Sequence, residues 1–409
     1  MSSCDADVLL VGGGLAAQRC CEALRRLGHE GSITIVCGEP SRPYDRPPLS
    51  KSVLLGSAPE HELEFRPASW YAEQDVRLLL GVRATGLDPG ARAVTLERAA
   101  GAETRLSYRK LVIATGARPR SLPGLTPGGR LHELRTSSDA SALRAALTTN
   151  GGRLAVIGAG LVGMEVAAAA RVLGLEVTLL EAGATPLERA LPAGLGRWMA
   201  ALHRSHGVAV RLGRTVDRVE QSRDAVRLWL DDGARVEAET VLVAAGTSPA
   251  TEWLAGTGLG PRTIETDAVG RTVLDDVFAA GDVASFPDPF LDAHLPSQHW
   301  EAAVRQGTAV AGAILGRPAP PPVPAMFWSD QHGRRIQMVG HAPALCSIEL
   351  DGTPSRGEPF AAWISGPRGP AAAMLVDRPD LLPGARRWIA QSPAAALTGN
   401  PKGVEPCPT

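Results

Sequence analysis

The chain has 409 residues, 44% of them hydrophobic, and its 42 basic and 43 acidic side chains give a net charge of −1. This length predicts two or three domains with sizeable cores. The charge balance gives no electrostatic basis for binding nucleic acid or an anionic membrane, and no apolar run approaches the roughly 20 residues of a membrane span. The first residues lack the basic and apolar parts of a signal peptide, so we expect a cytoplasmic protein.

A strand is expected over residues 8–11 and leads into a glycine-rich turn. The fingerprint positions of this turn are Gly12, Gly14 and Ala17. A helix is expected over Gln18–Leu27 and a strand over Ser32–Val36, with the acidic Glu39 after it. In a dinucleotide fingerprint the glycines allow a tight turn, close approach of the pyrophosphate and close packing of helix on strand. The phosphates then lie at a helix N-terminus, and the acidic residue can bond a ribose hydroxyl.

The same pattern recurs after a second expected strand at residues 154–157. Its fingerprint positions are Gly158, Gly160 and Gly163. A helix is expected over Glu165–Leu173, followed by a strand over Val177–Leu180 that ends in Glu181. Two such units predict two bound nucleotides and doubly wound parallel α/β sheets. Alternating residues at 76–110 and 208–243 predict antiparallel excursions.

The C-terminal part follows a proline-rich run at residues 317–324, which marks a domain boundary because proline interrupts helices and central strands. Strands are expected over Gln337–Gly340 and Ser347–Leu350 and a helix over Leu382–Gln391, giving a small α+β domain. The predicted organisation has three domains, the first of them discontinuous. Their bounds are 1–115 with 245–318, then 116–244, then 325–409.

The six cysteines contain no Cys-x-x-Cys pair, so neither a redox disulfide nor a metal site is expected. Lysine is rare: the chain has only three, Lys51, Lys110 and Lys402, so 39 of the 42 basic residues are arginine. By position Cys37 is the one candidate for the lone active cysteine of a peroxidase or water-forming oxidase. It precedes Glu39 in the adenosine-binding region, which argues against that role.

Seven motifs together resemble the FAD-dependent, NADH-using ferredoxin reductases of bacterial oxygenase systems, which belong to the pyridine nucleotide-disulfide oxidoreductase superfamily but lack the redox cysteines. In chain order the motifs are Gly12–Ala17, Arg42–Lys51, Leu111–Arg120, Gly158–Glu165, Asp276–Asp282, His299–Gly307 and Phe327–Gln331. The resemblance implies two Rossmann-like domains, the first for FAD and the second, inserted into it, for NAD, followed by a C-terminal α+β domain.

The resemblance also implies roles for individual residues. Lys51 would lie near the flavin N5 and pair with Glu165, Trp328 would lie beside the flavin, and Asp282 would bond its ribityl or phosphate part. A lysine there would stabilise negative charge on the reduced ring, and the carboxylate would offset the burial of the cation. The full set of expected cofactor-binding residues is Gly12, Gly14, Ala17, Glu39, Arg46, Lys51, Ala114, Arg118, Gly158, Gly160, Gly163, Glu165, Glu181, Gly246, Asp282 and Trp300.

Glu181 predicts a preference for NADH, because a carboxylate binds both ribose hydroxyls but repels the 2′-phosphate of NADPH. Residues 182–188 supply no Arg or Lys for that phosphate. The segment at 243–249 departs from the family, with Thr247-Ser248 where relatives have a Val-Arg-like pair. This departure weakens predictions about residues there.

The functional hypothesis is transfer of a hydride from NADH to FAD, followed by transfer of single electrons to a ferredoxin that supplies an oxygenase such as a cytochrome P450. Alternatives that stay open are a rubredoxin or nitrite reductase component and a slow FAD/NADH redox sensor. A monomer or weak homodimer is expected. Arg305, Arg334 and Arg335 flank the Trp300 and Trp328 motifs and are candidates for a basic docking patch.

Overall fold

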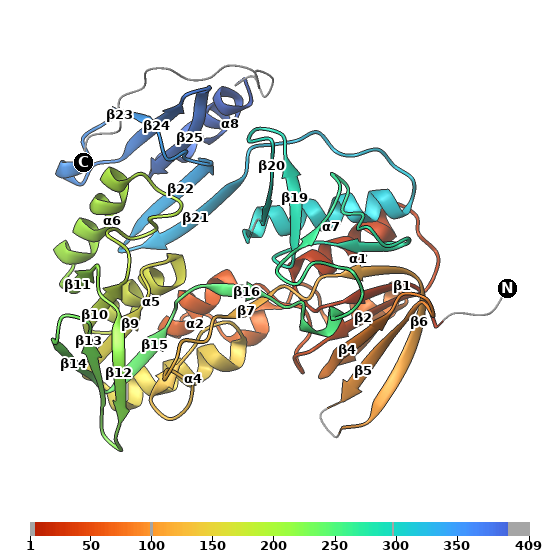
Figure 1. The fold of residues 1–409 in the computed structure, drawn as a ribbon, viewed down its shortest axis with the longest axis horizontal. Helices are drawn as coiled ribbons and strands as arrows, with labels where there is room; N and C mark the ends of the chain where they lie inside the picture. The colour runs from red at the N-terminus through yellow and green to blue at the C-terminus, as the bar shows by residue number, and fades with distance from the viewer. Residues whose placement is uncertain (1–4, 99–100, 297, 392–409) are drawn as a thin grey trace. The chain divides into compact units, whose positions relative to one another are not determined.

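The computed structural model describes residues 5–98, 101–296 and 298–391, and the chain divides into two compact units (Figure 1). Unit 1 comprises Met1–Asp45, Leu63–Arg118 and Ser248–Ala325, and unit 2 comprises Arg46–Glu62, Pro119–Thr247 and Met326–Thr409. The chain passes between the units five times, and two of these passages lie within short strands, β7 (Ala117–Pro119) and β16 (Thr247–Pro249). The three-domain division expected from the sequence stays a prediction.

Unit 1 is built on a sheet with the order β3-β2-β1-β6-β5-β4, in which β18 also pairs with β6. Its parallel strands are β1 (Ala6–Val11), β2 (Ile33–Cys37), β3 (Val76–Leu80), β6 (Glu103–Ile113) and β18 (Val277–Ala279). β1 and β2 are apolar almost throughout and buried, as expected for strands covered on both faces. Helices α1 (Leu15–Arg26) and α7 (Trp300–Ile314) pack against each other and share one core cluster with these strands.

The remaining elements of unit 1 are α3, two antiparallel strands and a small second sheet. They are α3 (Ala68–Glu73), β4 (Val82–Asp88), β5 (Ala93–Arg98), β17 (Ile264–Glu265), β19 (Ala284–Asp288) and β20 (Ala293–Pro296). The antiparallel excursion expected over residues 76–110 holds for β4, β5 and the first part of β6. It is wrong for residues 76–80, because after α3 the chain returns beside β2 as a parallel strand.

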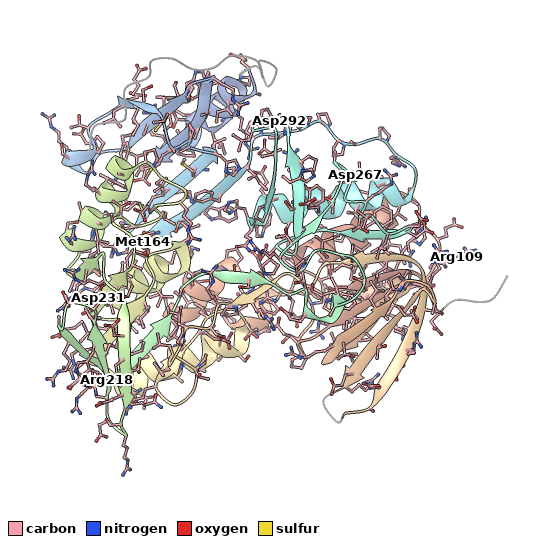
Figure 2. The ribbon with its side chains drawn as sticks, in the orientation of Figure 1. Arg109, Met164, Arg218, Asp231, Asp267 and Asp292 are labelled. Carbon is pink, nitrogen blue, oxygen red and sulfur yellow. The ribbon has the colours of Figure 1, made fainter. Side chains whose placement is uncertain are left out.

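Unit 2 contains a five-stranded parallel sheet with the order β11-β10-β9-β15-β8. Its strands are β8 (Leu131–His132), β9 (Arg153–Ile157), β10 (Glu176–Glu181), β11 (Val208–Leu212) and β15 (Thr240–Val243). The helices are α2 (Ser52–Leu55), α4 (Ser137–Asn150), α5 (Leu161–Val172) and α6 (Ala193–Ser205). Antiparallel pairing within residues 208–243 is confined to β12 (Val216–Gln221), β13 (Val226–Leu230) and β14 (Arg235–Ala238), since β11 and β15 join the parallel sheet. Figure 2 shows Arg218 on β12, whose guanidinium lies 3.9 Å from the ring centre of Trp229.

The C-terminal part of unit 2 is an antiparallel sheet with the order β21-β22-β25-β24-β23, followed by a helix. The elements are β21 (Met326–Gln331), β22 (Arg334–Gly340), β23 (Ser347–Asp351), β24 (Phe360–Gly366), β25 (Gly369–Val376) and α8 (Leu382–Ala390). The turn between β21 and β22 consists of His332 and Gly333, both with positive φ, as a two-residue type I′ hairpin requires. Histidine is among the residue types that tolerate this conformation.

The predicted fold class is confirmed: parallel Rossmann-like sheets precede a C-terminal α+β part. The helices after the two fingerprints begin earlier than expected, α1 at Leu15 rather than Gln18 and α5 at Leu161 rather than Glu165. In both, the second glycine, Gly14 or Gly160, is itself the N-cap, so the helix starts inside the motif. Among the described residues, no helix combines the length and apolarity needed to cross a bilayer.

Candidate functional site

The carboxyl ends of four parallel strands in unit 1 carry four of the predicted cofactor residues. Gly12 follows β1, Glu39 follows β2, Ala114 follows β6 and Asp282 follows β18. Open parallel sheets bind ligands at this edge, where adjacent strands end in loops. Residues spread over 270 positions of sequence, by the difference between 282 and 12, therefore meet at one edge because the strands are neighbours in the sheet.

The turn after β1 has the shape that a phosphate-binding loop needs. Gly12 has a φ of +128°, and a Cβ there would overlap the carbonyl oxygen of Ala114, so only glycine fits between the two loops. Gly14 caps α1 with no side-chain bond, and a Cβ built on it meets nothing within 4 Å. The first turn of α1 contains no acidic residue, so its N–H groups and dipole remain favourable to an anion. Ala17, at the third fingerprint position, is fully buried.

Helix α7 holds both the start of α1 and the turn that carries Asp282. The backbone of Gly307 is so close to Ala16 that a Cβ would overlap the Ala16 carbonyl oxygen. The side chain of Gln306 accepts a hydrogen bond of 2.8 Å from the N–H of Gly281, which has a φ of +81°. Asp282 is half-buried directly after this turn. At the first residue of α7, the indole N–H of Trp300 donates to Asp45 Oδ1 at 2.8 Å.

The acidic residue after β2 is oriented by a buried tyrosine. The hydroxyl of Tyr44 donates to Glu39 Oε2 at 2.6 Å, and Tyr44 is 5% exposed. Cys37, two residues earlier, is buried with its sulfur against Gly13 of the glycine-rich turn. Burial raises the pKa of the Cys37 thiol to about 12, and the nearby Glu39 carboxylate adds to the shift. This thiol stays protonated at neutral pH, so it lacks the thiolate character of a reactive cysteine.

Unit 2 repeats the phosphate-binding geometry at the start of α5. Gly158 has a φ of +108° and adjoins the carbonyl oxygen of Ala244, while a Cβ on Gly160 would meet nothing within 4 Å. A Cβ on Gly163 would overlap the carbonyl oxygen of Gly158, so this glycine lets helix α5 pack closely on β9. The three positions therefore serve the turn, the open phosphate cradle and the helix packing, in the order that the fingerprint predicts.

Glu181 ends β10 with its carboxylate beside this second loop. Oε2 accepts from the N–H of Ala159 at 2.7 Å and Oε1 accepts from the N–H of Gly183 at 2.8 Å. Glu188 brings a second carboxylate next to Gly183, because a Cβ on Gly183 would lie 2.6 Å from Glu188 Oε2 and 3.3 Å from Glu181 Oε1. The intervening Leu187 has a φ of +52°, an unfavourable conformation for a bulky residue, and its N–H reaches the carbonyl oxygen of Ala159.

Lys51 and Glu165, which the resemblance pairs, form a salt bridge of 2.7 Å between Nζ and Oε2 within unit 2. Their side chains are 21% and 6% exposed. Lys51 follows the short 3₁₀ helix Pro47–Ser50, whose two leading prolines rigidify the segment, and Glu165 lies on the second turn of α5. Two hydroxyl groups complete the carboxylate shell at 2.5 Å each: Ser50 donates to Oε2 and Ser329 donates to Oε1.

Sequence reasoning missed Ser50 and Ser329. Ser50 adjoins Lys51 but gives no signal of its own, because serine is common in turns. Ser329 lies next to Trp328 on β21, and strand alternation sends neighbouring side chains to opposite faces. Ser329 is 1% exposed, whereas Trp328 is half-buried. The available signal for Ser329 is that a polar residue stands at a strand position that faces the core, where it needs a hydrogen-bond partner.

The other predicted residues are found in varied settings. The guanidinium of Arg46 donates to the carbonyl oxygen of Arg135, and Gly246 has a φ of +94° with open space around it. Arg118 is exposed and ion-paired with Glu252. Its charge is therefore partly neutralised by that carboxylate.

The three arginines of the candidate docking patch all have partners inside the protein. In unit 1 Arg305 donates to the carbonyl oxygens of Pro321 and Val323. In unit 2 Arg334 pairs with Asp377 at 2.8 Å, and Arg335 pairs with Asp330 at 2.8 Å. The two ion pairs reduce the positive charge that Arg334 and Arg335 present to a partner.

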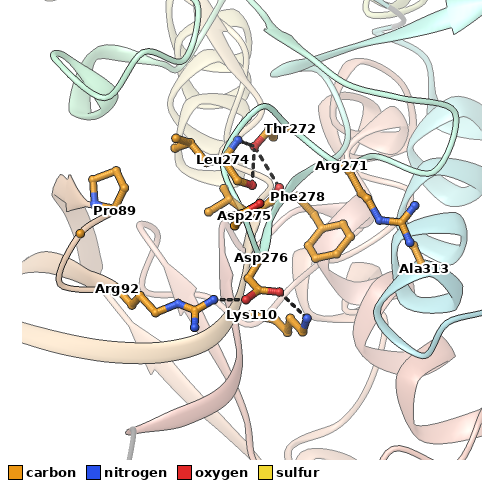
Figure 3. A pocket seen from close by; sticks show the side chains of 12 residues that line it. Pro89, Arg92, Lys110, Arg271, Thr272, Leu274, Asp275, Asp276, Phe278 and Ala313 are labelled. Atoms are coloured by element: carbon orange, nitrogen blue, oxygen red, sulfur yellow. Dashed lines mark hydrogen bonds and ion pairs between the residues drawn. The ribbon is translucent and has the colours of Figure 1, made fainter.

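A pocket of about 910 Å³ opens at the amino end of β18, the opposite end of that strand from Asp282 (Figure 3). Asp276 lies between Arg92 and Lys110 and forms an ion pair with each, and Arg271 also lines the pocket. These pairs connect the residue before β5 and the parallel part of β6 to the residue before β18. We therefore interpret the cluster as a structural ion-pair network, separate from the predicted cofactor residues at the carboxyl ends of the strands.

The two glycine cradles fit the pyrophosphates of two dinucleotides, and Glu39 and Glu181 fit the riboses. Within the described ranges, no group of three or more His, Cys, Asp or Glu side chains is arranged to hold a metal ion. Four cysteines lie in the same ranges, all of them free: Cys20, Cys21, Cys37 and Cys346. Cys4 and Cys407 fall outside the described residues.

Comparison with known proteins agrees with this geometry. Residues 6–307 match the family model of the pyridine nucleotide-disulphide oxidoreductases, and residues 326–399 match the reductase C-terminal family. The chain is 36% identical to the ferredoxin–NAD(+) reductase component of the anthranilate 1,2-dioxygenase system of Burkholderia cepacia, over 93% of each chain. It is 38% identical to the corresponding component of the biphenyl dioxygenase system of Paraburkholderia xenovorans, over 86% of this chain and 85% of the other.

A solved structure of a covalent putidaredoxin reductase–putidaredoxin complex matches with a TM-score of 0.89 and 30% identity, covering 95% of this chain and 94% of the other. The family match, the two dinucleotide cradles and the C-terminal sheet point to one conclusion. The chain belongs to the pyridine nucleotide-disulphide oxidoreductase family of oxidoreductases, and it resembles the ferredoxin reductases among them.

Proposed function

We propose that this protein is an NADH-dependent ferredoxin reductase, which takes a hydride from NADH onto FAD and passes single electrons to a ferredoxin that supplies an oxygenase. The observation that carries the proposal is the pair of open glycine cradles, each with an acidic residue at the end of the next strand. The relatives named above support it, because they are ferredoxin–NAD(+) reductase components of oxygenase systems.

FAD is assigned to the carboxyl edge of the unit 1 sheet. Gly12 and Gly14 admit the pyrophosphate, Glu39 binds the adenosine ribose, and Asp282 binds the ribityl or phosphate part. The closeness of α7 to α1 and to the Gly281 turn supports a rigid site. When bound, the flavin accepts two electrons together and releases them one at a time, which no amino-acid side chain present here can do.

NADH is assigned to the β9–α5 turn in unit 2. Gly158 and Gly160 admit the pyrophosphate, and Glu181 binds both ribose hydroxyls. Glu188 adds a second negative charge beside Gly183, which opposes the 2′-phosphate of NADPH. Arg214 donates its backbone N–H to the Glu181 carbonyl oxygen, but its guanidinium is paired with Asp232 at 2.6 Å. The local charge therefore favours NADH over NADPH.

Lys51, Glu165 and Trp328 are assigned to the flavin chemistry. Lys51 keeps a positive charge available to the reduced ring, and Glu165 with its two serine donors holds that charge in place. Trp328 supplies an aromatic surface that excludes water. None of these groups forms a covalent intermediate, which agrees with the lack of a redox cysteine pair among the described residues.

The proposal is tested by turnover of the purified holoenzyme. Acid release should yield FAD, and NADH should support rapid reduction of a [2Fe–2S] or a [3Fe–4S] ferredoxin, with cytochrome c as the final acceptor. Omission of the ferredoxin should slow cytochrome c reduction strongly. A stable NADH–flavin complex with negligible turnover would contradict the enzyme and favour the sensor. Equal rates with and without ferredoxin would contradict the assigned acceptor.

A further inference from the structure

A line of buried polar side chains runs away from Glu165 through unit 2. Ser329 donates to Glu165 Oε1 at 2.5 Å, and Gln331 Nε2 donates to Ser329 Oγ at 2.9 Å. Gln331 Oε1 lies 2.9 Å from His203 Nε2, and His203 Nδ1 lies 3.1 Å from His332 Nε2. Three secondary elements supply the line, since Glu165 is on α5, His203 on α6, and Ser329 and Gln331 on β21.

Every bond in this line has the same direction. A serine hydroxyl has a single proton. Because Ser329 donates that proton to Glu165, its oxygen must accept the hydrogen bond that joins it to Gln331. With its amide N–H₂ so engaged, Gln331 presents its oxygen to His203, which donates through Nε2–H. The other nitrogen of a neutral His203 is then the acceptor for His332. Four successive donors are thus aimed at one carboxylate, and each bond polarises the next.

The imidazoles at the far end are kept neutral, as this direction requires. Burial lowers the pKa of His203, the bond to Gln331 opposes that shift in part, and the neighbouring His206 lowers it further. Burial, His203 and His206 lower the pKa of His332 to about 3. The rings of His332 and His206 are stacked with centres 4.2 Å apart. A protonated His203 would present N–H groups on both sides and break the order of the bonds.

The burial of these polar side chains indicates that they do more than stabilise the fold. Ser329, Gln331 and His203 are 1%, 1% and 0% exposed. Apolar residues of similar size would fill the same volume without the desolvation of three polar groups. A fully satisfied polar network instead gives a unique arrangement to the group at its end.

We propose that Ser329, Gln331 and His203 are positioning residues that aim the carboxylate of Glu165 at Lys51. This inference rests on the proposed function for the meaning of the pair, but not for its test. Loss of the Ser329 hydroxyl leaves Glu165 Oε1 without this donor, so the carboxylate rotates and the salt bridge to Lys51 weakens. Loss of the Gln331 amide frees the Ser329 hydroxyl to turn away and has a smaller effect of the same kind.

The rarity of lysine makes a direct test practical. Competitive acetylation of the purified full-length protein at pH 8, read by mass spectrometry, reports the reactivity of Lys51 relative to Lys110. Lys110 serves as the internal reference because it lies in unit 1, paired with Asp276. Ser329→Ala should raise the Lys51 to Lys110 labelling ratio by about fivefold, because the Lys51 amine then spends more time outside its salt bridge, where it can reach the reagent. Gln331→Met should raise the ratio by about twofold.

Thr240→Val is the matched control, because it removes a buried hydroxyl from the same unit in a strand remote from the line in sequence. It should leave the labelling ratio unchanged. Ratios for Ser329→Ala and Gln331→Met equal to that of Thr240→Val, in folded protein, would overturn the inference. If Ser329→Ala fails to fold, Gln331→Met carries the test, since it retains the hydroxyl that contacts Glu165.

A second measurement separates this inference from the proposed function. In the FAD-loaded protein, Ser329→Ala should make the reduction potential of the flavin more negative, because the charge of Lys51 is then held less firmly in place by Glu165. Altered labelling without bound FAD or without NADH oxidation would overturn the proposed function and leave the positioning role standing. Normal ferredoxin reduction with unaltered labelling and potential in both variants would overturn the positioning role alone.

Discussion

Replacement of Glu181 by glutamine should reverse most of the preference for NADH. The substitution keeps the length and shape of the side chain and removes its charge. The amide oxygen can still accept from Ala159 or Gly183, the two N–H groups that the carboxylate now holds at 2.7 and 2.8 Å. The fold of the β9–α5 turn is therefore expected to survive, so the effect on nucleotide choice can be measured.

The expected size has two parts. Loss of charge-assisted hydrogen bonds to the ribose hydroxyls removes about 1.5 kcal/mol, which lowers kcat/KM for NADH roughly tenfold. A 2′-phosphate with two negative charges about 5 Å from the carboxylate is repelled by about 1.7 kcal/mol in water, so its removal raises kcat/KM for NADPH roughly 15-fold. The ratio of the two efficiencies should therefore fall by about two orders of magnitude.

The assay is steady-state reduction of a ferredoxin with each nucleotide in turn. Glu176→Gln is the control, because it makes the same change at the exposed opposite end of β10 and should leave the ratio unaltered. Equal ratios for Glu181→Gln and the unsubstituted protein would refute the role of Glu181. A fall in both efficiencies by the same factor would instead indicate that the loop, rather than its charge, had changed.

Three further substitutions have distinct expected outcomes. Gly14→Ala should destabilise the FAD-free protein by only about 0.5–1 kcal/mol, because alanine is a poorer N-cap than glycine but its methyl group enters open space, and it should weaken FAD binding roughly tenfold or more, as seen by ultrafiltration. Gly163→Ala should destabilise the protein by about 1–3 kcal/mol in a denaturant titration, because its methyl group overlaps the Gly158 carbonyl. His332→Asn should make the free energy of unfolding less dependent on pH in the acid range. His332 has a pKa lowered to about 3 in the folded protein, so between pH 6.5 and 3 it binds a proton more readily in the unfolded chain, which favours unfolding. The free energy of unfolding linked to this group is fully present above pH 6.5 and declines as the pH falls toward 3, by up to about 2.7 kcal/mol at pH 4.5.

Each outcome has a counterpart that would contradict it. Full FAD retention in Gly14→Ala would contradict the binding of the pyrophosphate at that turn. An unaltered denaturant midpoint for Gly163→Ala would contradict the close packing of α5 on β9. His61, an exposed histidine on the 3₁₀ helix Glu60–Leu63, provides the control for the pH series. An identical fall in stability between pH 7 and 4.5 for His332→Asn, His61→Asn and the unsubstituted protein would contradict the linkage.

Much of the cofactor framework could be predicted from local sequence, because the reasons for it are local. Gly12 and Gly158 stand where a positive φ and a close loop allow no side chain, and Glu181 ends the strand that follows the second fingerprint. The error in the helix starts is also local. Apolar periodicity reports the buried face of α1 and α5 but gives no sign that Gly14 and Gly160 are themselves the caps.

The surroundings of Glu165 could not be predicted in this way. Ser50 and Ser329 are separated by a long stretch of sequence and meet at Glu165 only because α5 packs beside β21 and the Pro47–Ser50 helix. The parallel placement of β3, β11 and β15 was missed for a similar reason, since alternation identifies a strand but not its partner. Non-local pairing decides both features.

The central claim is that two electrons enter from NADH together and leave singly to ferredoxin. An anaerobic titration of the FAD-loaded protein followed by rapid mixing with oxidised ferredoxin measures this directly. One equivalent of NADH should bleach the flavin completely, and the reduced protein should then reduce two equivalents of ferredoxin. Bleaching with no transfer to ferredoxin, or no bleaching by NADH at all, would contradict the account.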